Sequence, residues 1–187
     1  MNTTTREVTR ATLSELPEVK RLIDAGRRIM RETGNLHQWD DTHPSIDQLR
    51  EDIEHGHCYL LKEDDANIAT FALIPGPDIT YRKIEQGEWI DNESPYYVIH
   101  RVASLPNHHG VMTDILGYCF AHTDNIRIDT HRDNLIMQHC LQKAGFCYCG
   151  IIHLLNGDER LAFQKVFNHE RNFRKASASP SLVSSKN

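Results

Sequence analysis

The sequence predicts an α/β fold in which one central mixed β-sheet is flanked by helices. Runs rich in β-branched and aromatic residues alternate along the chain with segments of helical period. Some neighbouring runs are joined by short turn signals, which predict antiparallel hairpins, whereas others are separated by a helix, which predicts parallel crossovers. The length of 187 residues suits one well-filled domain. We place it at residues 6–167 and expect the Ser-rich remainder, 168–187, to be a disordered tail.

The N-terminal part predicts a short strand, EVTRAT, and then two amphipathic helices. Apolar residues recur at helical spacing from Leu13, and Pro17 suits a first helical turn. Gly34 ends this helix. Ser45 stands three residues before a glutamine, the spacing of a capping box, and predicts a second helix to about Glu54.

The middle of the chain predicts three strands. HCYLLK from His57 and NIATFALI from Asn67 form two strands joined by an acidic turn. The Pro-Gly-Pro sequence at 75–77 breaks the pattern, and the segment to Ser94 is expected to be a loop with a helical turn. After Pro95, the run YYVIHRVAS predicts a strand buried on at least one face.

The C-terminal half predicts a crossover followed by a hairpin. Gly110 opens a segment of helical period, VMTDILGYCFAH, and IRID from Ile126 is the next strand. A further helix begins at Asp133, which we expect to be its cap, and stops at Gly145. Asn156-Gly157 lies between two apolar runs and predicts an antiparallel turn.

Composition excludes several classes of protein. The net charge of -5 gives no global basic field for nucleic acid. No segment approaches the roughly 18 uninterrupted apolar residues of a membrane span, and the first ten residues lack the apolar region of a secretory signal. We therefore expect a cytoplasmic protein that binds neither nucleic acid nor membranes.

Cysteine and histidine do not form a recognisable metal site. The five cysteines form an odd set without a disulfide framework, so we expect reduced thiols. Cys147 and Cys149 put two sulfurs on one face of a strand, but no second ligand pair follows at zinc spacing. We interpret them as small buried hydrophobes. The twelve histidines, including His108 and His109, contain no H-E-x-x-H pair, and we predict no metal.

Two segments, together with the order of elements, resemble the GNAT superfamily of N-acetyltransferases over roughly residues 6–166. The segments are the strand, glycine loop and helix from Val98 to Phe120, and the block Asp133-Asn134-x-x-Met137 followed by Lys143-x-Gly145-Phe146. In addition, GNLHQW at 34–39 and RIDTHRDNLIMQ look like one bacterial subgroup of this superfamily.

The resemblance implies that acetyl-CoA is a cosubstrate and lies between two parallel strands, here 97–104 and 126–129. Its pyrophosphate would rest on the loop before the next helix, because the first turn of a helix has N–H groups without intrahelical partners. The implied contact residues are Val102, Ala103, Ser104, Gly110, Val111, Met112, Thr113 and Asn134.

The phosphate loop departs from the family pattern, which resembles Gln/Arg-x-x-Gly-x-Gly/Ala. This chain has Asn107-His108-His109-Gly110-Val111-Met112 and keeps only the first glycine. Met112 takes the place of a small residue, and we expect its side chain to turn outward. The alternative is an ordinary β-to-α connection whose glycine relieves backbone strain.

Candidate catalytic residues lie on the central strand. His100 has the unperturbed basicity of a general base, although a buried histidine with satisfied partners is the alternative. Tyr97 is a second candidate, and Glu85 and Glu88 are others that would act through water. Relatives often have a tyrosine proton donor where this chain has Leu141, so the leaving thiolate would take its proton from water.

The resemblance places the acceptor pocket at the first two helices and the segment before the central strand. Trp39, Tyr81 and Trp89 are the expected pocket residues, with Trp39 as an anchor of a small core as the alternative. Asp40 and Asp41 could attract a cationic amine or be solvated loop carboxylates.

These observations predict an N-acetyltransferase that moves acetyl from acetyl-CoA to a primary amine by direct attack, without metal. The acceptor could be a small molecule or a peptide. The alternatives are a non-catalytic acyl-CoA-binding sensor or regulatory module on the same fold, and a fold relative that has lost the cofactor. Self-association as a homodimer is left open.

Overall fold

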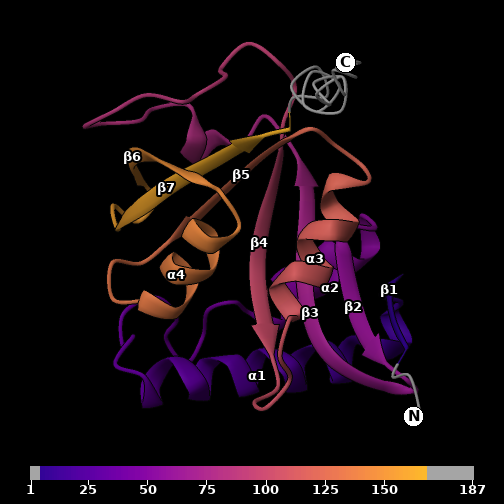
Figure 1. Cartoon of the computed structure of the whole chain (residues 1–187). Coiled ribbons are helices and arrows are strands. Elements are labelled where there is room, and N and C mark those ends of the chain that lie inside the picture. The colour runs from indigo at the N-terminus through magenta and orange to yellow at the C-terminus, as the bar shows by residue number, and fades with distance from the viewer. Residues whose placement is uncertain (1–4, 168–187) are drawn as a thin grey trace, which may run out of the picture.

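The structure is a computed structural model that describes residues 5–167 and contains one seven-stranded mixed sheet with helices on both faces (Figure 1). The strands are β1 (Arg6–Arg10), β2 (Cys58–Glu63), β3 (Ala66–Pro75), β4 (Tyr97–Ser104), β5 (Asn125–Thr130), β6 (Cys147–His153) and β7 (Glu159–Val166), in the spatial order β1-β2-β3-β4-β5-β7-β6. The helices are α1 (Leu16–Glu32), α2 (Ile46–Glu54), α3 (Val111–Phe120) and α4 (Leu135–Lys143), with 3-10 turns at Leu13–Glu15 and Ile79–Tyr81. The predicted fold class and element order are confirmed. The predicted tail, 168–187, lies outside the described residues.

The two faces of the sheet are built by the alternation of side chains along β2. Cys58 and Leu60 point to one face and pack with α1 and α2. Tyr59 and Leu61 point to the other, where they join the core under α3 and α4. This period of two is what a strand buried on both faces requires. The alternation therefore fixes which helix pair covers which face.

The sheet opens between β4 and β5, its one parallel strand pair among the described residues. These strands pair only from Tyr97↔Ile126 to Ile99↔Ile128. On the other side of β4, the register against β3 shifts between Thr70 and Ala72, and Arg101 has a φ of +54°. Such a bulge bends the strand and re-aims its side chains. Figure 1 shows β5 running obliquely away from β4. The C-terminal part of β4, Val102–Ser104, is thus without a strand partner on its β5 side.

Two local expectations are wrong. The cap of α4 is Asn134, whose Oδ1 accepts a hydrogen bond from the Met137 N–H at 3.1 Å, and not Asp133. Cys149 is buried, as expected, but Cys147 is exposed because the register shift in β6 between Tyr148 and Gly150 interrupts the alternation. In the described part of the chain, no helix is both long and apolar enough to cross a bilayer.

Candidate active site

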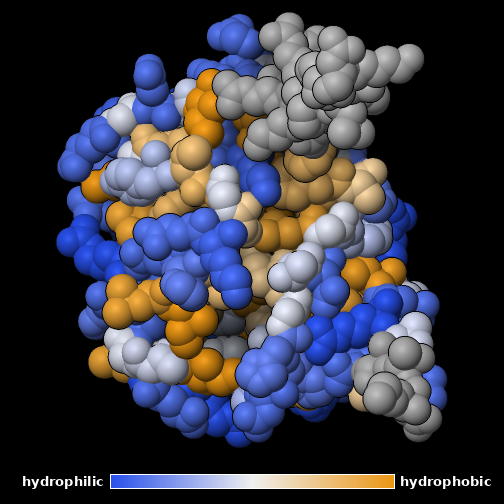
Figure 2. Space-filling model, viewed as in Figure 1, coloured by the Kyte–Doolittle hydropathy of each residue, from blue (hydrophilic) through white to orange (hydrophobic). Residues whose placement is uncertain are grey.

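An elongated cavity of about 820 Å³ follows the place where β4 and β5 separate, and we call it the apolar groove. All eight residues predicted to contact the cofactor line it: Val102, Ala103, Ser104, Gly110, Val111, Met112, Thr113 and Asn134. Its other walls come from α1, α3 and α4. Figure 2 shows apolar surface between α3 and α4 on this side of the molecule. The structure therefore brings together segments of chain that the sequence separates by more than thirty residues.

The apolar groove is lined by basic side chains and by no described acidic ones. Lys143, Lys165, His108 and His109 line it, and no described lining residue is an aspartate or glutamate. The whole chain carries a net charge of -5, so this distribution is local. A groove lined by apolar surface and cations suits a ligand that is partly apolar and partly anionic.

The loop that enters α3 is held in place by side chains of the edge strand β1 and its neighbour β2. Gly110 is the residue before the helix and has a φ of +77°, a conformation that favours glycine. Arg6 on β1 donates to the His109 carbonyl at 2.7 Å and to the Asp114 carboxylate at 2.8 Å. His108 lies 2.9 Å from Glu63. The loop before α3 is therefore fixed where it lines the groove, and the first-turn N–H groups of the helix have no intrahelical partners.

Met112 does not turn outward as the sequence suggested. It lines the apolar groove, is partly buried and packs against the core under α3. The reason is that it occupies the first turn of a helix whose inner face carries Val111 and Ile115. Its long side chain is accommodated as part of the groove wall.

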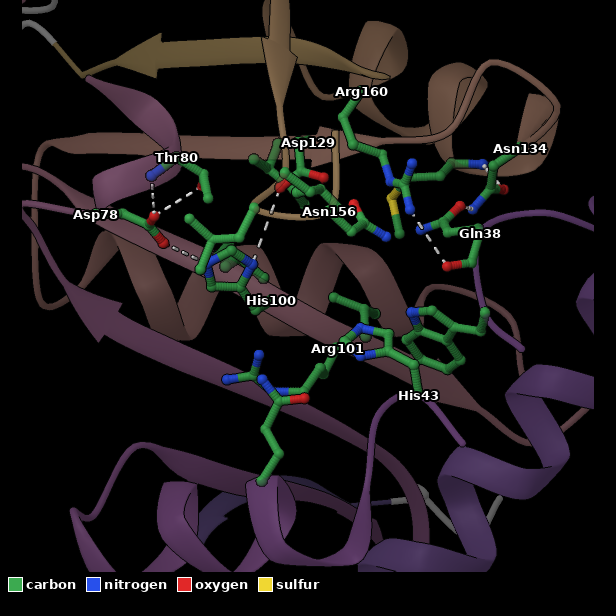
Figure 3. Close-up of a pocket in the computed structure, with 18 of the residues that line it drawn as sticks. Gln38, His43, Asp78, Thr80, His100, Arg101, Asp129, Asn134, Asn156 and Arg160 are labelled. Carbon is green, nitrogen blue, oxygen red and sulfur yellow. Dashed lines mark hydrogen bonds and ion pairs between the residues drawn. The ribbon is translucent and has the colours of Figure 1, made fainter. Parts of the chain in front are cut away.

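A second cavity of about 480 Å³, which we call the polar cavity, lies beside the apolar groove (Figure 3). The two share the lining residues Met30, Val102, Asn134 and Met137. The ionisable residues that line the polar cavity are His43, Asp78, His100, Arg101, Asp129 and Arg160. A ligand in the groove and a second molecule in the polar cavity would therefore meet at β4 and the start of α4.

His100 lies between two carboxylates at one end of the polar cavity (Figure 3). Its Nε2 is 3.1 Å from Oδ2 of Asp78, and its Nδ1 is 3.9 Å from Oδ1 of Asp129. The shorter contact is a hydrogen bond, whereas the longer one is not, so an atom beside the pair can bond with both groups. Tyr81 donates to Asp129 at 2.5 Å. This end can therefore bind a cation and accept a proton from it.

Two groups of this cluster, Asp78 and Tyr81, are held in defined protonation states. Burial raises the pKa of Asp78, but hydrogen bonds from His100 and Thr80 outweigh burial and bring the pKa to about 2. Burial and the neighbouring Asp129 charge hold the pKa of Tyr81 well above its ordinary value. The Tyr81 hydroxyl thus stays a donor, and Asp78 stays ionised.

The shifted pKa of Asp78 makes stability depend on acidity. Because the folded-state pKa lies below the ordinary 3.8, the carboxylate stabilises the fold above about pH 4, and this contribution disappears as the pH falls through about 2. We expect Asp78→Asn to lower the melting temperature at pH 6, and the difference from wild type to shrink between about pH 4 and 2. Thermal unfolding over that range measures it. A difference that is the same at every pH would contradict this account.

Gln38 connects the polar cavity with the loop after β5. Its Oε1 accepts hydrogen bonds from four donors: Asn35 Nδ2 at 3.0 Å, Asn134 Nδ2 at 2.9 Å, Thr130 Oγ1 at 3.2 Å and the His131 N–H at 3.3 Å. Four donors identify this atom as the amide oxygen. The segment Gly34–Trp39 thus has a structural role at the site: its glutamine holds the start of α4.

The other predicted pocket residues lie at different depths. Trp39 is 6% exposed and lines the polar cavity, so it is both a wall and an anchor of the core under α1 and α2. Tyr81 lies behind the residues that line the polar cavity, and Trp89 stacks on it with 5.4 Å between the ring centroids. Neither lines the cavity. Trp89 instead covers the guanidinium of Arg127, which lies 4.0 Å from its ring.

The structure does not bring Tyr97 to the site. Tyr97 packs on the core under α3, on the face of β4 opposite to His100, and lines neither cavity. Leu141 is fully buried in the same core. Glu85 pairs with Lys83 in the loop that bridges to Ile151. Asn134 does line both cavities, but its Oδ1 and one Nδ2 hydrogen are used by Met137 and Gln38.

Among the ionisable residues of the polar cavity, Asp78, Asp129 and Arg160 were not predicted from the sequence. Asp78 and Asp129 lie in different segments, and only the fold places them around His100. Arg160, on β7, lies in a hairpin that gave no functional signal. Among residues 5–167, no group of three or more His, Cys, Asp or Glu side chains is arranged to hold a metal ion.

Comparison with known proteins identifies the family. No model of a protein family and no curated protein matches the sequence. A solved acetyltransferase of the GNAT family from Streptococcus agalactiae 2603 is 30% identical, with a TM-score of 0.79, over 87% of this chain and 96% of that one. The chain therefore belongs to the GNAT family of acetyltransferases.

Two more distant structures share the fold. AAC(6')-Ib, solved in complex with paromomycin and acetyl-CoA, is 14% identical with a TM-score of 0.60 over 95% of this chain and 99% of that one. Naa50 of Arabidopsis thaliana, solved with the bisubstrate analogue CoA-Ac-MVNAL, is 14% identical with a TM-score of 0.56 over 87% and 99%.

Proposed function

We propose that this protein transfers an acetyl group from acetyl-CoA to a primary amine, with acetyl-CoA in the apolar groove and the amine in the polar cavity. The observation that carries the proposal is the junction of the two cavities at Val102 and Asn134. Acetyl-CoA supplies an activated acyl thioester. The two distant neighbours, bound to acetyl-CoA and to a CoA bisubstrate analogue, support this reading.

The groove has the features that acetyl-CoA requires. The strand edge Val102–Ser104 lacks a partner on its β5 side, so its backbone groups are free to bond with the amides of a pantetheine arm. The fixed loop at Gly110 presents first-turn N–H groups to a pyrophosphate. Lys143 and Lys165 add positive charge to the lining. Met112 is part of the wall and leaves this cradle in place.

His100 and Asp129 are proposed to prepare the amine. An alkylamine arrives largely as an ammonium ion, which is attracted to the two carboxylates at this end of the cavity. Its nitrogen is proposed to lie beside His100 Nδ1 and Asp129 Oδ1, which are 3.9 Å apart, and to bond with both. His100 accepts the proton, with Asp78 orienting the ring through the 3.1 Å contact, and the neutral amine attacks the thioester carbon.

In this proposal the nitrogen loses its second proton to water as the carbon–sulfur bond breaks, and water passes a proton to the leaving thiolate. Leu141 is buried and cannot donate, and the structure offers no tyrosine among the described residues that line the apolar groove. A thiolate is a weak base and a good leaving group, so transfer proceeds without a dedicated acid. The sensor alternative shares the groove but needs no proton acceptor at His100.

The proposal is tested by calorimetric titration of acetyl-CoA into the wild type and Gly110→Ala, with free CoA as a reference. Alanine at a φ of +77° is strained and shifts the loop, so we expect acetyl-CoA to bind about tenfold more weakly. The control is Gly157→Ala, because Gly157 has a φ of +91° in the β6–β7 turn outside the groove. This variant should lose similar stability and keep its affinity.

An assay of free CoA release with a broad amine panel completes the test. Micromolar binding together with CoA release supports the enzyme. If acetyl-CoA binds well and no amine releases CoA, the sensor alternative replaces the transferase. If neither acetyl-CoA nor CoA binds, the chain is a fold relative without the cofactor.

A further inference from the structure

Arg160 is a buried cation at the end of the polar cavity away from His100 (Figure 3). It is the second residue of β7, and its side chain is 5% exposed. Figure 3 shows Arg160 beside Gln38 and Asn134, whereas Asp78 and His100 lie at the opposite side of the cavity. A guanidinium at this depth is costly unless an anion or several acceptors surround it.

The hydrogen bonds of Arg160 satisfy only part of this group. Nη1 donates to the neighbouring Glu159 carbonyl at 2.9 Å, and Nη2 to the Gln38 carbonyl at a long 3.4 Å. Its ion-pair partner, Asp158, is 3.8 Å away and 52% exposed. Burial lowers the pKa of Arg160 against the weaker attraction of Asp129 and Asp158, as expected for a poorly compensated charge.

Two other arginines with largely buried side chains show how this protein compensates such a charge. Arg101 lines the same cavity but makes two hydrogen bonds with Asp52, at 2.6 and 2.7 Å. Arg127 lies between the rings of Trp89 and Tyr96, at 4.0 and 3.8 Å. Arg160 has neither a bidentate carboxylate nor an aromatic sandwich. Among these three, it alone retains binding capacity for an anion in the cavity.

We propose that the acceptor is a small amine that also carries a carboxylate, which pairs with Arg160 while the amine faces His100 and Asp129. This inference rests on the proposed function and specifies its acceptor. The cavity of about 480 Å³ has room for a free amino acid or a short peptide. Guanidinium and carboxylate form a planar, two-bond pair, which would also fix the orientation of the amine.

The charge arrangement disfavours a diamine. A second ammonium group at the far end of the cavity would meet Arg160 and be repelled by it. By contrast, a molecule with one amine and one carboxylate places each charge opposite its complement. The two ends of the cavity therefore differ in the charge they bind: one suits the ligand's carboxylate and the other its amine.

The experiment uses pairs of amines that differ only by a carboxylate: lysine with cadaverine, phenylalanine with phenethylamine, and histidine with histamine. Binding of each compound to the full chain saturated with free CoA is measured by calorimetry, and acetylation is measured as CoA release from acetyl-CoA. We expect the carboxylate member of at least one pair to bind at least tenfold more tightly. For that pair, Arg160→Gln should remove the preference mainly through KM, and Arg160→Lys should restore part of it.

The matched control is Arg132→Gln, which removes an exposed arginine that pairs with Glu159 on the same hairpin and lies outside the polar cavity. This variant should keep the wild-type preference, and circular dichroism of each variant reports folding. Equal or reversed binding within every pair, or no binding of any carboxylate member, overturns the inference. Acetylation of the decarboxylated amines alone would overturn it while leaving the proposed function intact. Carboxylate-dependent binding without any CoA release would instead count against the transferase.

Discussion

Replacing His100 by alanine should lower kcat by about a hundredfold or more and leave acetyl-CoA affinity unchanged. His100 is on β4 and lines the polar cavity. Asp78 lies near one of its ring nitrogens and Asp129 near the other. Without the imidazole, the amine stays protonated in the field of two carboxylates and cannot attack. Because His100 lines the polar cavity and not the apolar groove, acetyl-CoA should bind as before.

Steady-state kinetics and calorimetry measure these two quantities independently. His122→Ala is the matched control, since His122 is exposed at the end of α3 and lines neither cavity. Its kcat should equal that of the wild type. If His100→Ala retains more than half of the wild-type kcat, His100 is a buried histidine with satisfied partners, and deprotonation of the amine is left to Asp129.

Local chemistry was sufficient to predict most elements of the fold. Asn156-Gly157 predicted the β6–β7 hairpin because a tight turn needs residues that tolerate positive φ, and Gly157 has a φ of +91°. Ser45 predicted the start of α2, and its Oγ accepts from the Gln48 N–H at 3.1 Å. The bulge at Arg101 had no such signal, because it arises from the register of β4 against β3.

The groove could be predicted better than the polar cavity. Gly110, Val102 and Asn134 were implied by the resemblance to the GNAT superfamily, whose strand–loop–helix order this chain shares. The polar cavity is formed by single side chains from the segment after β3, from β5 and from β7, so its composition depends on tertiary packing. Asp133 was preferred to Asn134 as the cap because both residues can serve, and only the backbone decides between them.

The sequence did indicate that Gly34–Trp39 matters, without indicating why. A buried asparagine, a glutamine and a buried tryptophan within five residues form an unusually polar entry to a core. In the structure, Asn35 is 2% exposed and donates to Gln38, whose oxygen also bonds with Thr130 at the end of β5 and with His131 in the following loop. The segment therefore joins the α1–α2 connection to the far half of the split sheet, across the cavities.

Gln38→Ala should consequently lower the free energy of unfolding by about 3 kcal/mol and raise the KM for acetyl-CoA. The substitution removes the common acceptor of Asn35, Asn134, Thr130 and His131. Each donor that is left buried without a partner costs about 1–3 kcal/mol, and donors that reach water in the adjacent cavity reduce the total. Asn134 would lose its hydrogen bond to Gln38. Because Asn134 lines both cavities, the wall that the groove and the polar cavity share would then be less firmly held.

Gln38→Glu separates the acceptor role from simple loss of volume. A glutamate keeps oxygen acceptors in the same place, so the four donors remain satisfied, and stability should stay within about 1 kcal/mol of the wild type. Urea unfolding measures both variants, and the linear slope checks that unfolding stays two-state. Equal destabilisation by alanine and glutamate would mean that Gln38 acts through its Nε2 group, and the tether between the two halves of the sheet would have to be sought in Asn134 itself.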